Sequence, residues 1–368
     1  MNYARIVHVV PYYPPHLGGM ENVAKAIVEV LAETGPVEVI TTTCGAKGLP
    51  LIERYSKLTV RRLRAREIAH IPIAPGLLFR LLCVPREAVV HVHVAQALIP
   101  EAVWLTRRIR RGEFIAHFHL DVAPSGRLGR FFVMYKNRIL GHTLRAAARV
   151  ITFSEDQARF LEKTYNVDSR AIVIIPNGVG KSFVPADTCD DQVPRTLRVL
   201  YVGRLSPQKA VPRLVEALAS MKEPAQAIFV GDGEERPSLE KLVRHYSLTN
   251  VRLVGAQYDA ELVRYYQWAD VLVLPSDREG MPLVVLEAMA CGLPVLATDV
   301  VGNRELLKNV GMLVAPRAPE LARALDRFAA DPGLRVDLSA RGLAAVRAYT
   351  WECLVQRLEP VYAQVRAK

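Results

Sequence analysis

Two glutamates, Glu279 and Glu287, stand eight positions apart and carry the clearest chemistry in the sequence. The apolar run 271–275 has the composition of a buried strand, and the polar residues 276–280 follow it as a loop. Residues 281–290 have helical composition, so we expect Glu279 in the loop and Glu287 inside the helix. Both carboxylates would lie near the positive end of the helix dipole. Because apolar residues flank Glu287, its carboxylate needs partners, and hydroxyl groups would suit both acids.

Two cations, Arg204 and Lys209, lie five positions apart between the apolar run 197–202 and a helical stretch. Cations at the carboxyl end of a strand, above the start of a helix, are what a diphosphate group requires. A pair of basic side chains in water is the ordinary alternative. The spacing therefore indicates a diphosphate site.

Glycine turns follow two other predicted strands. Gly18 and Gly19 precede a helix, where adjacent glycines let backbone amides approach a phosphate, although a plain turn explains them equally well. Gly231, Asp232 and Gly233 form a loop after a later strand. No G-x-G-x-x-G sequence follows a predicted strand, which counts against a nicotinamide dinucleotide.

The histidines fall on predicted strands. His91 and His93 alternate inside one strand, where a satisfied structural role is favoured. His119 ends the next strand, at the edge where ligands of parallel sheets bind. His117 points the same way from two residues earlier and is the competing candidate for a functional role.

The elements that must position these residues alternate between strands and helices, which predicts two α/β domains with parallel, doubly wound sheets. At 368 residues the chain can bury two cores. We place the first domain at residues 1–185 and the second at 190–350, with a polar linker between them. The last helix, 351–368, is expected to pack back on the first domain.

These motifs stand in the order of glycosyltransferase family 4, and the chain resembles these retaining enzymes over nearly its whole length. The resemblance implies the GT-B fold, in which two Rossmann-like domains face each other across a cleft. It also implies transfer of a hexosyl unit, with retention, from a nucleotide diphosphate sugar of the GDP-mannose or UDP-glucose type.

The resemblance assigns a role to each motif. Arg204 and Lys209 would stabilise charge on the departing diphosphate. Glu287 would hold the ribose hydroxyls, Glu279 the sugar hydroxyls, and His119 would contact the sugar beside the transferring carbon. The further donor contacts that it implies are Gly18, Gly19, Glu21, Gly231, Asp232, Gly233, Val254, Gly280, Met281, Pro282, Leu283 and Val284. The chain departs from the family pattern in having Ala210 after Lys209 and Asn303 after Gly302, where glycines are usual.

The net charge of +11 is confined to the first half of the chain. Residues 1–185 hold 25 Lys and Arg against 14 Asp and Glu, whereas residues 186–368 hold 23 of each. This asymmetry indicates an anionic partner for the first domain.

We expect that partner to be an anionic, lipid-borne acceptor, met during peripheral association with an anionic membrane. Its basic face would lie on a helix at 127–145, with the arginine cluster Arg107 to Arg111 adding to it. The residues of that face are Arg127, Arg130, Phe131, Met134, Arg138, His142 and Arg145. A soluble sugar or sugar-phosphate acceptor is the alternative.

Composition excludes several other classes. No apolar run is long enough to span a membrane and no signal peptide is evident, so we expect a cytosolic protein. Five scattered cysteines indicate reduced thiols, mostly packed in cores.

Metal-using glycosyltransferases commonly present a D-x-D pair, which is absent, so we expect neither a metal nor another cofactor. The basic charge is not accompanied by a nucleic-acid motif. A GT-B epimerase or phosphorylase and a sugar-nucleotide sensor without catalysis remain alternatives.

Overall fold

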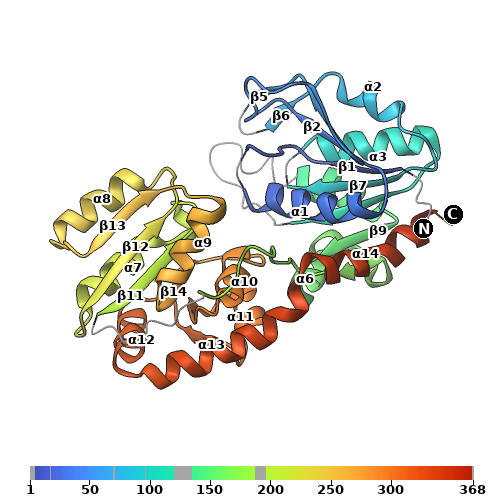
Figure 1. Cartoon of the computed structure of the whole chain (residues 1–368). Coiled ribbons are helices and arrows are strands. Elements are labelled where there is room, and N and C mark those ends of the chain that lie inside the picture. The colour runs from blue at the N-terminus through green and yellow to red at the C-terminus, as the bar shows by residue number, and fades with distance from the viewer. Residues whose placement is uncertain are drawn as a thin grey trace. The chain divides into compact units, whose positions relative to one another are not determined.

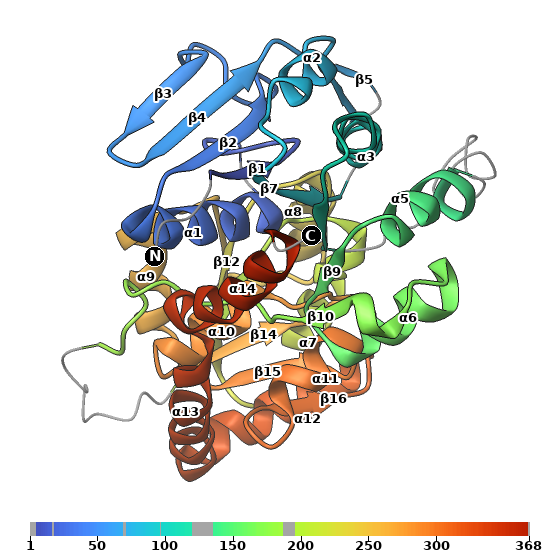
Figure 2. The same ribbon diagram turned by 90° about the vertical axis from the view of Figure 1, so that its right-hand side faces the viewer.

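The structure is a computed structural model that describes residues 5–16, 18–68, 71–95, 97–119, 135–186 and 196–366. It divides into two compact units. Unit 1 comprises Met1–Asn177 with Trp351–Lys368, and unit 2 comprises Gly178–Thr350. Figures 1 and 2 draw the elements of both units from two directions.

Unit 1 is built, over its described residues, on an eight-stranded sheet in the order β10-β9-β8-β7-β1-β2-β4-β3. Its strands are β1 (Ile6–Val9), β2 (Val37–Thr42), β3 (Ile52–Tyr55), β4 (Leu58–Leu63), β7 (Val89–Val94), β8 (Phe114–Phe118), β9 (Arg149–Thr152) and β10 (Ile172–Ile174). Neighbouring strands are parallel except β3 and β4. β5 (Arg66–Ile68) and β6 (Ile71–Ile73) form a separate hairpin. The strand order reverses between β1 and β7, because the chain passes from β1 to β2 on one side and later adds β7 on the other.

The helices of unit 1 cover both faces of this sheet. They are α1 (Gly19–Thr34), α2 (Leu77–Leu82), α3 (Ile99–Arg110), α5 (Gly141–Arg145), α6 (Glu155–Tyr165) and α14 (Trp351–Arg366), with a π-helical turn at Lys136–Leu140 and a 3-10 turn at Ser169–Ala171. Alternating strand residues such as Val7 and Val9 pack against α2, α3, α5 and α6. On the opposite face α14 lies beside α1 (Figure 1). Of the predicted helix, residues 127–134 lie outside the described ranges, and 135–145 are helical.

Unit 2 has a six-stranded sheet over its described residues, in the order β13-β12-β11-β14-β15-β16, with all neighbours parallel. Its strands are β11 (Leu197–Val202), β12 (Ala225–Val230), β13 (Val251–Gly255), β14 (Val271–Leu274), β15 (Val295–Thr298) and β16 (Met312–Val314). The order reverses between β11 and β14, which makes their carboxyl ends the expected ligand site.

Helices pack on both faces of the unit 2 sheet. They are α7 (Val211–Ser220), α8 (Arg236–His245), α9 (Asp259–Trp268), α10 (Leu283–Ala290), α11 (Val301–Leu307), α12 (Ala318–Ala330) and α13 (Pro332–Val346). Along β11, Val199 and Tyr201 belong to the core beneath α7 and α12, whereas Leu200 and Val202 belong to the core beneath α9 and α10. The predicted fold class, two α/β units with parallel, doubly wound sheets, is confirmed.

Two expectations from composition can be compared with the structure. No helix in the described ranges is both long and apolar enough to cross a bilayer. Of the cysteines within those ranges, Cys44 and Cys291 are buried, whereas Cys83 and Cys353 are exposed. The expectation that the thiols mostly pack in cores is therefore wrong for half of those described.

Candidate active site

Lys209 and Glu279 form an ion pair at the carboxyl edge of the unit 2 sheet. Lys209 ends a short turn after β11, and Glu279 lies in the loop after the neighbouring strand β14. The Nζ atom of Lys209 lies 2.7 and 2.9 Å from the two carboxylate oxygens, and Ser276 Oγ donates to Oε1 at 2.6 Å. Only 5% of the Glu279 side chain is exposed. The two residues that the sequence places at this edge are thus direct partners at the reversal of strand order.

The loops after β11 and β14 are tied together by further bonds. The backbone N–H of Asp277 donates to Gln208 O at 2.9 Å, and Gln208 Nε2 donates to Arg278 O at 2.9 Å. Arg213 donates to Pro275 O at 2.5 Å and to Asp277 Oδ1 at 2.6 Å. These contacts hold Glu279 and Lys209 on a single rigid edge rather than on two independent loops.

Arg204 has a different environment from Lys209. Its side chain is 72% exposed, and its guanidinium lies 3.7 Å from Glu234. The carbonyl oxygen of Arg204 accepts a bond from Tyr201 Oη at 3.0 Å. The structure therefore gives the two predicted diphosphate ligands separate partners, and their joint role stays a prediction.

Glu287 lies on α10 and is paired with Tyr266 on α9. Tyr266 Oη donates to Glu287 Oε2 at 2.6 Å. Burial raises the pKa of Glu287 to about 7, because it disfavours the charged carboxylate more than the tyrosine bond favours it. The pKa of Tyr266 is raised well above its usual value by burial and by the neighbouring carboxyl group. Tyr266 supplies the partner that the apolar surroundings of Glu287 require.

Glycines allow the loops at this edge to approach one another closely. Gly231 has φ +137°, and a Cβ on it would lie 1.9 Å from Gly203 O. A Cβ on Gly233 would lie 2.3 Å from Leu205 O. Asp232 Oδ1 accepts from the backbone N–H of Gly233 at 2.8 Å, so this carboxylate is turned toward its own loop. Both glycines are required by backbone packing, whether or not they also contact a phosphate.

The start of α11 packs directly on the loop that carries Glu279. A Cβ on Gly302 would lie 2.3 Å from Gly280 O and 2.8 Å from Glu279 O. The adjoining residues of the predicted donor site precede or begin α10, and all except Pro282 keep some exposed surface: Gly280, Met281, Pro282, Leu283 and Val284. Gly302 therefore helps to set the position of Glu279.

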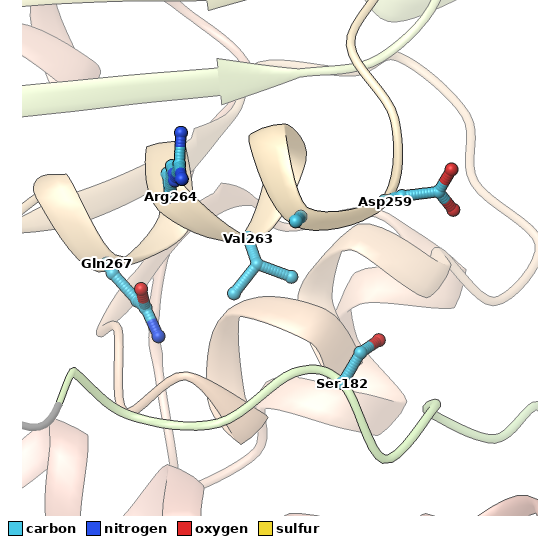
Figure 3. Close-up of a pocket in the computed structure, with 6 residues that line it drawn as sticks. Ser182, Asp259, Val263, Arg264 and Gln267 are labelled. Carbon is cyan, nitrogen blue, oxygen red and sulfur yellow. The ribbon is translucent and has the colours of Figure 1, made fainter.

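A pocket of unit 2 lies away from this edge, beside α9 (Figure 3). Its volume is about 330 Å³, and it is lined by Ser182, Asp259, Ala260, Val263, Arg264 and Gln267. This lining includes none of the residues predicted to bind the donor.

Val254, at the end of β13, is partly buried, and its carbonyl oxygen accepts from Gln257 Nε2 at 3.1 Å.

In unit 1, Gly18 caps α1 and Gly19 begins it. Glu21 is 5% exposed, and its carboxylate bonds to His16 Nδ1 at 2.8 Å and lies 2.2 Å from where a Cβ on Gly18 would stand. The His16 ring stacks on Tyr12 at 4.2 Å between centroids. A phosphate approaching Gly18 would thus meet a carboxylate, and the predicted phosphate contact stays a prediction.

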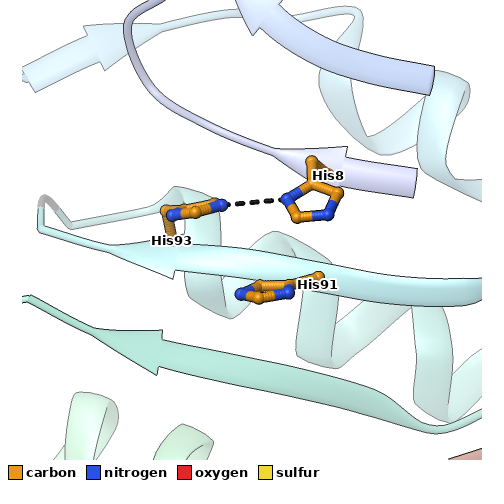
Figure 4. A group of neighbouring side chains, drawn as sticks. All are labelled: His8, His91 and His93. Atoms are coloured by element: carbon orange, nitrogen blue, oxygen red, sulfur yellow. Dashed lines mark hydrogen bonds between the residues drawn. The ribbon is translucent and has the colours of Figure 1, made fainter. Parts of the chain in front are cut away.

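Five histidine rings lie on the face of the unit 1 sheet that α14 covers. They are His8 of β1, His91 and His93 of β7, His117 of β8 and His119 just beyond it, and each is at most 8% exposed. With Tyr362 of α14 they form what we call the histidine ladder, part of which is drawn in Figure 4. His8 is opposite His91, and His93 is opposite His117, in the strand registers. The register of parallel strands therefore assembles the ladder.

From the carboxyl edge of the sheet, the ladder begins at His119. His119 Nε2 lies 2.9 Å from His93 Nδ1, and His93 Nε2 lies 3.0 Å from His8 Nδ1. His119 is thus held at the carboxyl edge of β8 by a ring bond, and the structural role expected for His93 consists of that bond. The residues that follow, 120–134, lie outside the described ranges.

Tyr362 connects His8 to the remaining two rings. Its hydroxyl group lies 3.4 Å from His8 Nε2 and 2.9 Å from His91 Nδ1. His91 Nε2 lies 3.2 Å from His117 Nδ1. His117 Nε2 is buried and has no hydrogen-bond partner within the described ranges. His117 and His119 stack at 4.5 Å, so they point the same way, as the sequence predicted.

The histidine ladder is neutral at physiological pH. Burial lowers the pKa of His8 and His117 to about 3 and that of His91, His93 and His119 well below the usual value. Neighbouring rings add to the lowering at four of the five, because a charge on one disfavours a charge on the next.

Two sets of three histidines bring their ring nitrogens close together, as a metal site would require. One nitrogen per ring lies within 4.8 Å of the others in His8, His91 and His93, and again in His93, His117 and His119. The ring pairs His8–His91 and His117–His119 are stacked at 4.5 Å, so their in-plane lone pairs run side by side instead of converging. We assign no metal to the ladder. The expectation that transfer needs no metal stays a prediction.

The fold has known counterparts. Sucrose-phosphate synthase from Thermosynechococcus elongatus matches with a TM-score of 0.79 and 24% identity over 99% of this chain and all of that one. Anabaena HepE in complex with UDP-glucose matches with a TM-score of 0.79 and 19% identity over 98% of this chain and all of that one. These likenesses define the GT-B fold of glycosyltransferases.

Sequence relatives define the family. The model of glycosyl transferases group 1 matches residues 193–344, and that of glycosyltransferase family 4 matches residues 17–182. A D-inositol 3-phosphate glycosyltransferase of Geodermatophilus obscurus is 30% identical over 97% of this chain and 87% of its own length. Another, of Actinosynnema mirum, is 31% identical over 62% of this chain and 61% of its own length. The chain belongs to glycosyltransferase family 4, as its motifs indicated.

Several residues that shape these sites were not singled out from the sequence. Ser276 bonds to Glu279, Tyr266 to Glu287, and His16 to Glu21. Only the positions of these residues in the fold reveal the three contacts. His8 had a detectable signal, because the histidines of β1, β7 and β8 recur in apolar runs that a parallel sheet would align. Tyr362 had none, since no sequence pattern connects α14 to β7.

Proposed function

We propose that the protein transfers a hexosyl unit, with retention at the anomeric carbon, from a nucleotide diphosphate sugar to an acceptor hydroxyl. The observation that carries the proposal is the Lys209–Glu279 ion pair at the reversal of the unit 2 strand order. Lys209 would exchange its carboxylate partner for a diphosphate oxygen when the donor binds, and Arg204 would add a second cation. Release of Glu279 from that pair would leave its oxygens to accept bonds from sugar hydroxyls.

Glu287 would bind the ribose of the donor. Its pKa of about 7 means that both protonation states are populated near neutral pH. The ionised form accepts hydrogen bonds from two neighbouring hydroxyl groups, and Tyr266 already holds one of its oxygens. His119 would contact the sugar from unit 1, as family membership suggests.

For the acceptor we propose a phosphate-bearing molecule. The basic charge is concentrated in residues 1–185, which suits an anionic acceptor. Two relatives carry the name D-inositol 3-phosphate glycosyltransferase, which is consistent with a phosphate on the acceptor. The donor base and sugar are open between the GDP-mannose and UDP-glucose types.

The test is turnover. The purified chain is incubated with GDP-, UDP- or ADP-linked hexoses and a panel of inositol, hexose and lipid phosphates, and released nucleoside diphosphate is measured. We expect release only with an acceptor, no loss in excess chelator, and a product whose anomeric proton coupling matches that of the donor. Donor binding without turnover on the whole panel would favour a sensor, and an inverted product would remove the retaining mechanism.

A lipid-borne acceptor is favoured by one surface of unit 1. α2 packs on α3, and large apolar side chains on both are exposed: Leu78 at 43%, Phe79 at 75%, Leu105 at 41% and Ile109 at 61%. Arg108, Arg110 and Arg111 on or just beyond α3 are exposed as well. Apolar side chains next to arginines suit the interface of an anionic bilayer.

This surface revises the predicted basic face. Arg107 does not contribute to it, because its guanidinium is buried and donates to the carbonyl oxygens of Pro85, Arg86 and Glu113. Arg138, His142 and Arg145 are exposed as predicted, while Arg127, Arg130, Phe131 and Met134 lie outside the described ranges. The membrane-facing role of either surface is a proposal.

Cosedimentation with vesicles tests it. We expect binding to anionic but not neutral vesicles, weakened by salt and by Phe79→Ser combined with Arg108→Glu. Arg252→Glu, an equal charge change at an exposed position of unit 2, should bind like the unchanged protein. Absence of binding at low salt would leave a soluble sugar phosphate as the acceptor.

A further inference from the structure

The histidine ladder is a continuous chain of five hydrogen bonds through six side chains. In order, its members are His117, His91, Tyr362, His8, His93 and His119. Each inner histidine uses both ring nitrogens within the chain. Because each ring is neutral, it has one N–H donor and one bare nitrogen acceptor. The hydroxyl group of Tyr362 likewise donates one bond and accepts the other.

Such a chain has two consistent proton arrangements. Each link needs one donor, and each inner member has one proton; if every such proton is paired within the chain, all donors point in the same direction. When the protons point toward His119, every ring carries its proton on Nδ1. When they point toward His117, every ring carries it on Nε2. A mixture either sets two N–H groups, or two bare nitrogens, against each other at one of the links, or has both neighbouring rings donate to Tyr362. The last case leaves the hydroxyl proton of Tyr362 buried without an acceptor.

The end at His117 decides between the two arrangements. Its Nε2 atom is buried without a partner in the described part of the chain. If the rings carried their protons on Nε2, this atom would be a buried donor without an acceptor. If they carry them on Nδ1, it is a bare acceptor. Buried donors without partners are the rarer of the two in folded proteins.

We propose that all five histidines carry their proton on Nδ1, so that His119 meets a ligand at the sheet edge as a hydrogen-bond donor. Its Nε2 atom is occupied as the acceptor from His93, and Nδ1 is the nitrogen that no other ladder member uses. Tyr362 is then a positioning residue, because its hydroxyl group joins the two parts of the chain. The ligand at His119 rests on the proposed function, but the proton arrangement does not.

The experiment is nitrogen NMR of the full chain with labelled histidine, without any substrate. The sequence has nine histidines, and His16, His70, His142 and His245 are changed to glutamine so that the remaining five signals all belong to the ladder. Long-range proton–nitrogen correlations distinguish Nδ1–H from Nε2–H rings. We expect five neutral rings, all protonated on Nδ1. A single ladder ring protonated on Nε2 overturns the proposal.

Tyr362→Phe tests the continuity of the chain. Without the hydroxyl group, His91 and His117 each face an unpartnered nitrogen, and either direction leaves one buried donor unpaired. We expect their two signals to show both tautomers, while the other three rings stay protonated on Nδ1. Tyr165→Phe, which removes a buried hydroxyl group of unit 1 outside the ladder, should leave all five signals unchanged. Unchanged signals in Tyr362→Phe would contradict the ladder as one unit.

A turnover measurement links the proton arrangement to the reaction. The amide nitrogen of asparagine overlaps the position of histidine Nδ1, whereas that of glutamine reaches the position of Nε2. We expect His119→Asn to retain about ten times the turnover of His119→Gln, the effect of one retained hydrogen bond. Equal turnover, or a more active glutamine variant, would overturn the donor role of His119. If the protein transfers no sugar, the NMR result still decides the proton arrangement.

Discussion

The two units place polar groups at the same topological position, but those of unit 1 are neutral and those of unit 2 are charged. In each sheet the strand order reverses next to the first strand, between β1 and β7 in unit 1 and between β11 and β14 in unit 2. Unit 1 fills the strands at this position with neutral histidines in one hydrogen-bond chain. Unit 2 leaves its strands apolar there and carries an ion pair on the loops beyond them.

The difference follows from burial. A ring that lies within the sheet and is hardly exposed cannot carry an uncompensated charge, so the ladder exists only with lowered pKa values. Lys209 is 23% exposed and sits on a loop, where a charged pair costs less and can exchange partners with a ligand. Unit 1 is thus suited to presenting a fixed donor, and unit 2 to neutralising a charged group that arrives and leaves.

The comparison predicts that acid weakens unit 1 more than unit 2. The folded-state pKa values of the ladder histidines lie below the unfolded value of 6.5, so the unfolded chain binds more protons between the two. Their contribution is complete above pH 6.5 and is lost as the pH falls toward 3. At pH 5 the loss is about 2 kcal/mol for His8 and about the same for His117.

Hydrogen exchange at pH 7 and pH 5, corrected for intrinsic rates, measures this loss strand by strand. We expect protection to fall in β1, β7 and β8 and to change far less in β11, β12 and β14. Equal losses in the two sheets would mean that the histidines are charged in the folded protein.

The second prediction concerns a substitution that breaks the Lys209–Glu279 ion pair of unit 2. Lys209→Ala should lower turnover by roughly a hundredfold or more, in line with loss of one group that stabilises transition-state charge. It also leaves the nearly buried Glu279 carboxylate with Ser276 as its remaining side-chain donor among the described residues. Steady-state kinetics on a variant with unchanged circular dichroism is the measurement. Lys241→Ala, at an exposed lysine of α8, is the control and should keep full activity.

Sequence patterns located the edge of each sheet but not the contacts across it. The strand, loop and helix predicted for residues 271–290 are present. The sequence assigned Lys209 and Glu279 to different parts of the donor, because spacing along the chain shows which edge a residue occupies and not which residue it bonds. Pairing depends on which strands are neighbours, and β11 and β14 are separated by two other strands in the sequence.

The third prediction concerns a substitution that displaces the loop carrying Glu279 without removing a charge. Gly302→Ala places a methyl group against the carbonyl oxygens of Gly280 and Glu279, so the loop must shift. We expect turnover to fall about tenfold, because catalytic groups lose efficiency when they are misplaced by a fraction of an ångström. Gly180→Ala, where the nearest atom would lie 3.8 Å from the added Cβ, is the matched control. An unaltered rate would show that the loop yields without moving Glu279.

The smallest effect is expected at Glu287, because its pKa of about 7 leaves the carboxyl group only partly ionised near neutral pH. Donor binding should tighten as the pH rises through about 7, since ribose hydroxyls bond more strongly to a carboxylate than to a carboxylic acid. Glu287→Gln imitates the protonated form, so its donor affinity should match the unchanged protein at pH 6 and be about three to ten times weaker at pH 8. Glu279→Gln should instead lower turnover with little change in affinity. Calorimetric titration with the donor, combined with kinetics, separates the two. The opposite pattern would be loss of the pH dependence of binding in Glu279→Gln and lowered turnover in Glu287→Gln. In that case the two carboxylates would have exchanged roles, with Glu279 as the ribose ligand, and the contrast between the two units would still hold.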